Sequence, residues 1–352
     1  MNFKKICLIV LAILIVVGIG VFAIMGKNNN EKSNAKYKVV ASNFASYDFL
    51  RAIIGDNKDI DLKFLMGPGK DAHSYDPTAG DIKAIQDAEL FVYVGGEMEK
   101  WADKVLDSVE TDGTEIICIA DFVETMEEKE VDGAEEHEHD HDHEDEEDEH
   151  HENEEHEEGE HHDEDEEHEH EHEEGAFDEH IWTSPENAIK MVNALEEAME
   201  KIDSKNSNIY KENANKYVAQ IKDVDNKIQN IVNNKVRDRL VFADKMPMQY
   251  FIDYYKLQVS AAFDGCSTET EPSAKTIAYL QNKVKEEKIP VVLYIELNPG
   301  KVAKTIADEA GNGCQAMQIQ TLHNVSLDDF KNGETWVSLM TRNLDVLKKA
   351  LQ

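Results

Sequence analysis

Histidine is the side chain with which this chain of 352 residues could do most chemistry, and the sequence holds 15 of them. Twelve alternate with carboxylates within residues 137–172: His137, His139, His141, His143, His150, His151, His156, His161, His162, His168, His170 and His172. Neutral imidazole is a good ligand for zinc, copper and nickel, and surrounding negative charge raises the local concentration of divalent cations. We therefore expect this run to collect metal ions.

The segment that carries these histidines is too charged to fold. Between Glu127 and Glu174 there are 30 carboxylates and one basic residue, which accounts for −29 of the formal net charge of −38. A segment this rich in charge has too little apolar surface to offset the entropy that would be lost on folding, so we expect it to be disordered. Metal sites in a disordered segment should be weak and exchangeable. The acidic balance also argues against a nucleic-acid partner, which would require a basic face.

Three histidines lie outside this segment, at His73, His180 and His323. The first lies in the motif D-A-H-S-Y-D-P-T (71–78) and the second in D-E-H-I-W-T-S-P (178–185). His73 follows the second predicted strand, at the carboxyl edge where open α/β sheets bind ligands. His323 follows the last predicted strand. The positions of the three histidines therefore depend on how the predicted strands and helices are arranged.

Those elements form two similar halves. Strands are predicted at 38–41, 59–65, 90–94 and 115–119, and again at 240–243, 258–262, 291–295 and 316–321. Helices are predicted at 45–54, 81–87 and 98–109, and again at 248–255, 273–287, 302–309 and 336–351. Continuous apolar strands that alternate with helices indicate a parallel sheet covered on both faces. The predicted fold class is therefore α/β, with two lobes, each a mostly parallel sheet flanked by helices.

A helical stretch joins the two lobes. Residues 185–234 contain no internal Gly or Pro after Pro185, and Ser184 with Pro185 is typical of a helix start. This stretch is either one long backbone helix or two helices broken near residues 203–205. Two α/β lobes with a cleft between them favour capture of a small ligand.

The N-terminus indicates an extracytoplasmic protein. Lys4 and Lys5 precede an apolar run over residues 6–25, which is long enough to span a bilayer and has no convincing cleavage site after it. A membrane anchor is the preferred interpretation, and a cleaved secretory signal the alternative. Outside the cell, Cys266 and Cys314 could pair or remain free thiols.

The predicted organisation has six parts. They are an anchor or signal (1–26), a polar tether (27–36), a first lobe (37–126), a disordered metal-binding loop (127–176), the end of the first lobe with the linker helix (177–236), and a second lobe (237–352).

The two histidine motifs resemble those of a known family, the extracytoplasmic solute-binding proteins of zinc and manganese ABC transporters. The stretch T-E-T-E-P-S (268–273) is similar to a further family segment, and zinc-specific members carry a His- and acid-rich loop where residues 127–176 lie. The resemblance covers about residues 37–351. It implies two α/β lobes joined by a long helix, and a metal ion held between them.

The resemblance also implies a ligand set, with one departure. His73 and His180 match the family's first two ligands, whereas the third, often a His followed by Asp, should fall within residues 241–247, where there is none. Asp244 is the nearest usable donor there. Glu296 matches the fourth ligand, a carboxylate after a later strand, and His323 is a rival third ligand.

The resulting prediction is a monomeric, membrane-tethered receptor that captures a divalent metal and passes it to an ABC-transporter permease. Zinc is preferred, because the His-rich loop favours it, and manganese is the alternative, because two nitrogens and two carboxylates suit both ions. A metal sink or adhesin without a transport role is a further alternative. A metallohydrolase is the least favoured, because no motif such as H-E-x-x-H supplies a general base.

Overall fold

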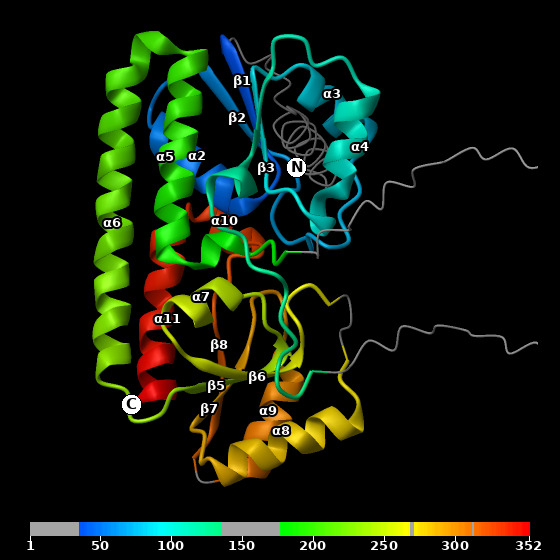
Figure 1. Ribbon diagram of the computed structural model, residues 1–352, viewed down its shortest axis with the longest axis vertical. Helices are drawn as coiled ribbons and strands as arrows, with labels where there is room; N and C mark the ends of the chain where they lie inside the picture. The colour runs from blue at the N-terminus through cyan, green and yellow to red at the C-terminus, as the bar shows by residue number, and fades with distance from the viewer. Residues whose placement is uncertain (1–34, 135–176, 268–270, 312) are drawn as a thin grey trace, which may run out of the picture.

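The computed structural model describes residues 35–134, 177–267, 271–311 and 313–352. Two four-stranded parallel sheets lie one above the other, each flanked by helices, as predicted (Figure 1). The predicted anchor and the twelve histidines of the acidic loop lie outside the described residues. Within the described ranges, no helix is long and apolar enough to cross a membrane.

The first sheet has the strand order β2-β1-β3-β4. Its strands are β1 (Tyr37–Ala41), β2 (Ile60–Phe64), β3 (Leu90–Tyr93) and β4 (Glu115–Cys118), and its helices are α2 (Phe44–Ile54), α3 (Ala79–Gln86) and α4 (Lys100–Ser108). Helix α2 begins where the Asn43 side chain accepts a hydrogen bond from the backbone N–H of Ser46, which satisfies a free donor of the first turn. The loops that follow these parallel strands all leave from one edge of the sheet.

The second sheet repeats this order as β6-β5-β7-β8. Its strands are β5 (Arg239–Lys245), β6 (Gln258–Phe263), β7 (Val291–Tyr294) and β8 (Gln315–Gln318), with helices α7 (Gln249–Tyr254), α8 (Ala274–Glu286), α9 (Lys301–Ala310), α10 (Leu327–Lys331) and α11 (Trp336–Leu351). The pairing of β5 with β6 shifts register between Phe242 and Lys245. The end of β5 is therefore irregular where Asp244 and Lys245 leave the sheet.

The helical stretch between the lobes is two helices, which decides between the two predicted alternatives. Helix α5 (Pro185–Ile202) ends at Asp203, and α6 (Ser207–Asn233) runs back beside it after a short turn (Figure 1). The Asp203 carboxylate accepts hydrogen bonds from Asn206 and Tyr210, which fixes the turn. Helix α6 has 27 residues, or about 40 Å at 1.5 Å per residue. It packs on α2 of the first lobe and α11 of the second, and is thus the backbone helix that joins them.

A crossing segment, residues 123–134, passes from the first lobe onto the second beside the C-terminal sheet (Figure 1). The Met126 backbone N–H donates to the Tyr250 hydroxyl at 3.0 Å, and that of Lys129 donates to Gln249 Oε1 at 2.8 Å. These bonds attach the segment to α7 of the second lobe.

The end of the crossing segment corrects one sequence-based boundary. The sequence predicts disorder from residue 127, but Asp132 forms a parallel bridge with Ser260 at the edge of β6. The Asp132 carboxylate also pairs with Arg239 and Lys283, each at 3.2 Å. Residues 127–134 are ordered because the second lobe supplies the partners that their own composition lacks.

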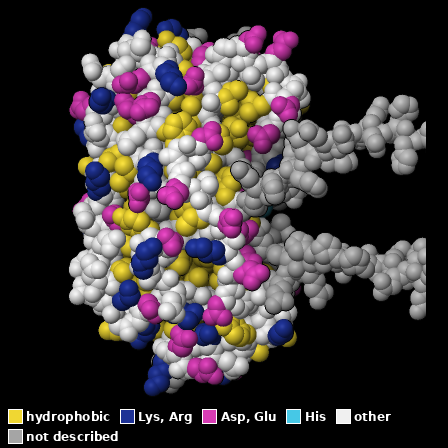
Figure 2. Space-filling view, viewed as in Figure 1, with side chains coloured by type: hydrophobic (Ala, Val, Ile, Leu, Met, Phe, Trp, Pro, Cys, Tyr) yellow, Lys and Arg dark blue, Asp and Glu magenta, His cyan; other side chains and the backbone are white. Residues whose placement is uncertain are grey.

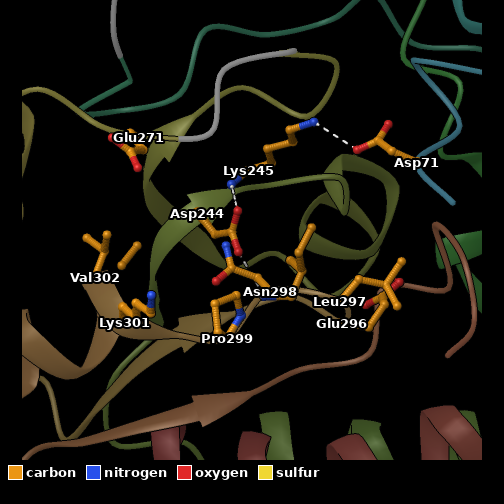
Figure 3. A pocket seen from close by; sticks show the side chains of 12 residues that line it. Asp71, Asp244, Lys245, Glu271, Glu296, Leu297, Asn298, Pro299, Lys301 and Val302 are labelled. Atoms are coloured by element: carbon orange, nitrogen blue, oxygen red, sulfur yellow. Dashed lines mark hydrogen bonds and ion pairs between the residues drawn. The ribbon is translucent and has the colours of Figure 1, made fainter. Parts of the chain in front are cut away.

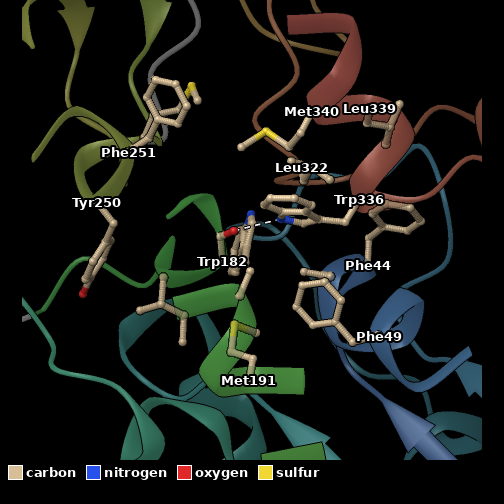
Figure 4. Packing of buried hydrophobic residues seen from close by; sticks show 14 of the residues in the cluster. Phe44, Phe49, Trp182, Met191, Tyr250, Phe251, Leu322, Trp336, Leu339 and Met340 are labelled. Atoms are coloured by element: carbon tan, nitrogen blue, oxygen red, sulfur yellow. Dashed lines mark hydrogen bonds between the residues drawn. The ribbon is translucent and has the colours of Figure 1, made fainter. Parts of the chain in front are cut away.

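One hydrophobic core extends through both lobes (Figure 4). Trp182 and Trp336 are both buried at its centre, and Trp336 Nε1 donates to the Trp182 carbonyl at 2.9 Å. Trp182 Nε1 in turn donates to the Thr321 carbonyl at 3.0 Å. These contacts pack the two lobes as one body around shared aromatic side chains.

On the face seen in Figure 2, basic and acidic side chains are interspersed.

Candidate metal centre

His180 lies just before the short turn Ile181–Thr183 that leads into α5, and it is fully buried. Asp178 Oδ1 accepts from the His180 backbone N–H at 2.8 Å and lies 3.1 Å from His180 Nδ1. This carboxylate fixes the ring, so Nε2 is the nitrogen that remains available as a ligand.

His73 lies in the long loop that follows β2, and its side chain is partly exposed. Asp71 Oδ1 accepts from the His73 backbone N–H at 2.9 Å, which forms a tight turn. The Asn324 side chain of the second lobe donates to the carbonyl groups of Gly67 and Lys70 in the same loop. The loop that presents His73 is thus attached to the loop that presents the third histidine.

His323 lies in the loop after β8 and is buried. Leu322 adopts a left-handed backbone conformation (φ 57°), which is costly for a branched side chain and turns the chain at this point. Glu296 holds the loop, because its carboxylate accepts from the Thr321 backbone N–H and from the Thr321 hydroxyl, each at 2.8 Å. Glu296, which the sequence predicts as a ligand, therefore holds the loop that carries His323.

The three histidines converge between the lobes. Their ring centroids are 5.6 Å apart for His73 and His180, 4.9 Å for His73 and His323, and 5.3 Å for His180 and His323. One ring nitrogen of each lies within 4.8 Å of those of the other two. Each Nε2 atom is buried and has no hydrogen-bond partner among the described residues. Buried, unpaired nitrogens are costly unless something binds them, and three neutral imidazoles are suitable ligands for zinc.

The pKa values of these rings move in different directions. Burial lowers the pKa of His73 to about 4, with further contributions from the charges of His180 and Lys245. Burial likewise lowers the pKa of His323 well below its ordinary value. Burial also opposes protonation of His180, but the charge and hydrogen bond of Asp178 outweigh it and raise the pKa overall. Two of the three rings are therefore neutral over a wide pH range, which is the form of imidazole that can bind a metal.

The structure does not bring the two predicted carboxylates into this group. Asp244 is buried, and its oxygens accept from the backbone N–H groups of Lys245 at 2.9 Å and Ile295 at 3.2 Å. The Glu296 carboxylate is engaged by the loop of His323, as described above. Both carboxylates accept hydrogen bonds from backbone N–H groups at strand ends. The residue that lies next to His73 and His180 is His323.

A cavity of about 380 Å³ lies beside the ends of β5 and β7 in the second lobe, and none of the three histidines lines it (Figure 3). Asp71, Asp244, Lys245 and Glu296 are among the residues that line it. Lys245 Nζ lies 3.3 Å from Asp71 Oδ2, an ion pair between the two lobes.

Cys266 lies beside the same centre, which the sequence did not indicate. Its thiol donates to Glu179 Oε2 at 2.9 Å, and burial is the main cause that raises its pKa. Cys266 and Cys314 are both free thiols. Cys266, Glu179 and His180 also form a group whose possible ligand atoms lie within 4.8 Å of one another.

Several known proteins are similar to this chain in sequence. The family described as zinc-uptake complex component A, periplasmic (ZnuA), matches residues 39–350. The high-affinity zinc uptake system protein ZnuA of Bacillus subtilis is 31% identical over 326 residues, which cover 92% of this chain and 91% of that protein. The zinc-binding protein AdcA of Streptococcus pyogenes is 30% identical over 323 residues, 90% of this chain but 56% of AdcA. The chain thus spans about half the length of AdcA.

Solved structures share the same architecture. The metal-dependent lipoprotein YcdH of Bacillus subtilis has a TM-score of 0.68 and 25% identity, over 90% of this chain and 99% of that one. The Zn(II)-bound ZnuA-like domain of Streptococcus pneumoniae AdcA has a TM-score of 0.67 at 24% identity, with the same two coverages, 90% and 99%. The second likeness, at this level of identity, shows the fold alone.

Proposed function

The chain belongs to the periplasmic zinc-uptake component A family, and on that premise we propose that it captures Zn²⁺ between its lobes. His73, His180 and His323 are the proposed ligands. The observation that carries the proposal is the convergence of three buried Nε2 atoms that have no partner among the described residues. We propose that the ion is a cargo and not a catalytic cofactor. A receptor requires ligands and a route of release, whereas a metallohydrolase also requires a general base.

Zinc is favoured over manganese by the donor atoms. Imidazole nitrogen is a preferred ligand of zinc, whereas manganese prefers oxygen donors. Carboxylate ligands would have suited manganese as well as zinc, but Asp244 and Glu296 accept hydrogen bonds from backbone groups instead. The ion with the greater preference for nitrogen is therefore the proposed cargo.

The remaining parts of the proposal concern the cellular context. Proteins of similar sequence are named as zinc uptake components and zinc-binding lipoproteins, which supports an extracytoplasmic receptor that is held at the membrane and delivers zinc to an ABC-transporter permease. A monomeric state is part of the same proposal. Residues 135–176 are proposed to collect zinc weakly, because their histidines and carboxylates are metal ligands.

The proposal is tested by competitive zinc titration of the full chain and of His73→Ala, His180→Ala and His323→Ala. Each substitution removes one of three ligands and is expected to weaken the tight site by at least ~100-fold, while the weak sites remain. Deletion of residues 135–176 is the reciprocal control, which should remove the weak sites and leave the tight one nearly unchanged.

Two results would contradict this assignment. If His323→Ala retains full affinity while Asp244→Ala or Glu296→Ala loses it, the second lobe supplies carboxylates and the three-histidine centre is wrong. If manganese competes with zinc at equal concentration, the proposed preference for zinc is wrong.

A further inference from the structure

A second group of metal-binding side chains, the Cys266 group, lies beside the three-histidine centre and shares His180 with it. It consists of Cys266, Glu179 and His180, and one ligand atom of each lies within 4.8 Å of those of the other two. Two ligands of one tetrahedral zinc ion are roughly 3.5 Å apart, because zinc lies about 2.3 Å from sulfur and about 2.0 Å from nitrogen or oxygen. The three side chains can therefore bind one ion after shifts of about 1 Å.

The loop that carries the thiol is held close to this group. The Cys266 backbone N–H donates to Glu128 Oε1 at 3.0 Å, which ties the loop to the crossing segment. On the other side, a Cβ atom at Gly265 would lie 3.1 Å from the carbonyl oxygen of Met246, so a larger residue would force the loop away. The position of the thiol is therefore fixed by packing on both sides.

The charges of the Cys266 group suit a divalent cation. Glu179 Oε1 accepts from the Met98 backbone N–H at 3.0 Å, whereas Oε2 accepts from the Cys266 thiol at 2.9 Å. An ion that replaces the thiol proton is bound by this oxygen and by a thiolate, and the proton is released to solvent. The carboxylate and the thiolate together balance the two charges of Zn²⁺, which three neutral imidazoles do not.

His180 can serve only one ion at a time. Its Nδ1 atom lies 3.1 Å from Asp178 Oδ1, and its Nε2 atom is buried without a hydrogen-bond partner among the described residues. One nitrogen is thus open to a metal, so an ion binds either with Cys266 or in the three-histidine centre. Burial is the main cause that raises the pKa of the Cys266 thiol, so loss of its proton is costly and the three-histidine centre is filled first.

We propose that Cys266, Glu179 and His180 form a second zinc position, which an ion occupies when the three-histidine centre cannot hold it. The inference rests on the proposed function, because the two positions share His180. Its place in the fold also connects it with the segment 135–176. The chain returns from that segment at Phe177, which pairs with Glu127 of the crossing segment, and Glu179 is two residues further on.

The test uses Co²⁺ as a probe for zinc sites, added to the full chain until the absorption spectrum no longer changes. A thiolate bound to Co²⁺ gives an intense charge-transfer absorption in the near ultraviolet, which imidazole and carboxylate ligands do not give. Residues 135–176 contain no cysteine and therefore do not contribute to it. The absorption is measured in His323→Ala, which removes a ligand of the three-histidine centre but none of the Cys266 group.

We expect the absorption of one bound thiolate per chain in His323→Ala. It should be absent when Cys266→Ser is added and absent in His180→Ala, because each lacks a ligand of the Cys266 group. It should persist when Cys314→Ser is added, a control that removes another free and partly exposed thiol. In the unmodified chain it should be at most about a tenth as strong, because the ion favours the three-histidine centre.

His73→Ala removes a different ligand of the three-histidine centre and should give the same absorption, so the test does not depend on the folding of one variant. Three results would overturn the inference. They are no thiolate absorption in either variant, absorption that survives Cys266→Ser, and absorption of full strength in the unmodified chain, which would make Cys266 a ligand of the same ion as the three histidines. Unaltered tight zinc binding by both His73→Ala and His323→Ala would instead refute the proposed function.

Discussion

The pKa values of the three histidines diverge although their rings are neighbours. His73 and His323 are neutral because burial and nearby positive charge oppose protonation. His180 has a raised pKa because Asp178 stabilises its protonated form. Protons compete with metal for the same nitrogen, so the ring with the highest pKa determines where acid begins to weaken binding.

The acid limit of zinc binding should therefore depend on Asp178. In the unmodified chain, affinity should fall about tenfold per pH unit once the pH is below the raised pKa of His180, and more steeply near pH 4, where His73 also protonates. Asp178→Asn keeps an acceptor for Nδ1 but removes the charge, so the onset should move to lower pH. At neutral pH the same variant should bind zinc about tenfold more weakly.

Zinc titrations between pH 4 and pH 8, with NMR titration of the His180 ring, check this expectation. An unchanged onset in Asp178→Asn would mean that another group controls the acid limit.

Glu99 is a second residue whose ionisation has a defined consequence. It is fully buried, and burial raises its pKa from 4.5 to about 7 although the backbone N–H groups of Val94 and Gly95 oppose the shift. Between pH 4.5 and pH 7 the folded state therefore keeps a proton that the unfolded state has lost. The stabilisation is complete below pH 4.5 and decreases as the pH rises. As the pH rises through 7, about 3 kcal/mol of unfolding free energy should be lost.

Urea unfolding at pH 4.5 and pH 8 tests this prediction against Glu99→Gln, whose side chain is neutral at both pH values. The variant should lose much less stability over this range than the unmodified chain. Parallel pH profiles of the two proteins would show that Glu99 does not titrate as expected.

At the scale of elements, the sequence predicted the sheets and pointed to His73 and His180, with His323 as a rival ligand, for identifiable reasons. Apolar runs such as 90–94 are recognisable as buried parallel strands, and His73 and His180 lie in motifs at the ends of elements. The side-chain orientations of Asp244 and Glu296 could not be predicted from the sequence pattern. Each carboxylate is turned toward backbone donors by contacts with another strand or loop, which sequence spacing does not encode.

The loop of His323 illustrates the same limit. The left-handed conformation of Leu322 is unfavourable locally and exists because Glu296 and the surrounding core hold both sides of the turn. Local propensity would not place His323 in the centre, and tertiary contacts do.

Glu296→Ala should therefore act through position rather than coordination. Loss of the acceptor leaves the buried N–H of Thr321 unpaired, which should cost about 1–3 kcal/mol of unfolding free energy and weaken zinc binding. Thr321→Val removes the hydroxyl contact to the same carboxylate and the 3.4 Å bond that this hydroxyl accepts from the His323 backbone N–H, and should weaken zinc binding in the same direction by a smaller factor.

Chemical denaturation and zinc titration of both variants separate the two roles. If Glu296 is a ligand, Glu296→Ala should lose most of its zinc affinity while Thr321→Val remains like the unmodified chain, and the positioning role would be refuted.

At the scale of the whole molecule, the two lobes share one core. Trp182 and Trp336 lie between them, and their indole N–H groups bond to Thr321 and to Trp182 across the junction. Each lobe also has a smaller buried cluster of its own, but the shared cluster is the largest, so side chains packed there stabilise both lobes together.

Trp336→Ala should consequently destabilise the entire chain by about 3–5 kcal/mol and leave a single unfolding transition. Hydrogen exchange should show amides of β1 and β5 losing protection to the same extent. Tyr294→Ala, a partly exposed side chain at the end of β7, is the control and should cost much less. Two separate transitions, one for each sheet, would contradict the shared core.

The unequal exposure of the three histidines has a kinetic consequence. His180 and His323 are buried, whereas His73 is partly exposed on a loop tied down by Asn324. An ion held by all three can reach solvent most directly past His73, so the residence time should be governed by opening of that loop rather than by parting of the lobes. Asn324→Ala would then shorten the residence time while leaving the association rate nearly constant, a separation that stopped-flow exchange with a chelator can resolve.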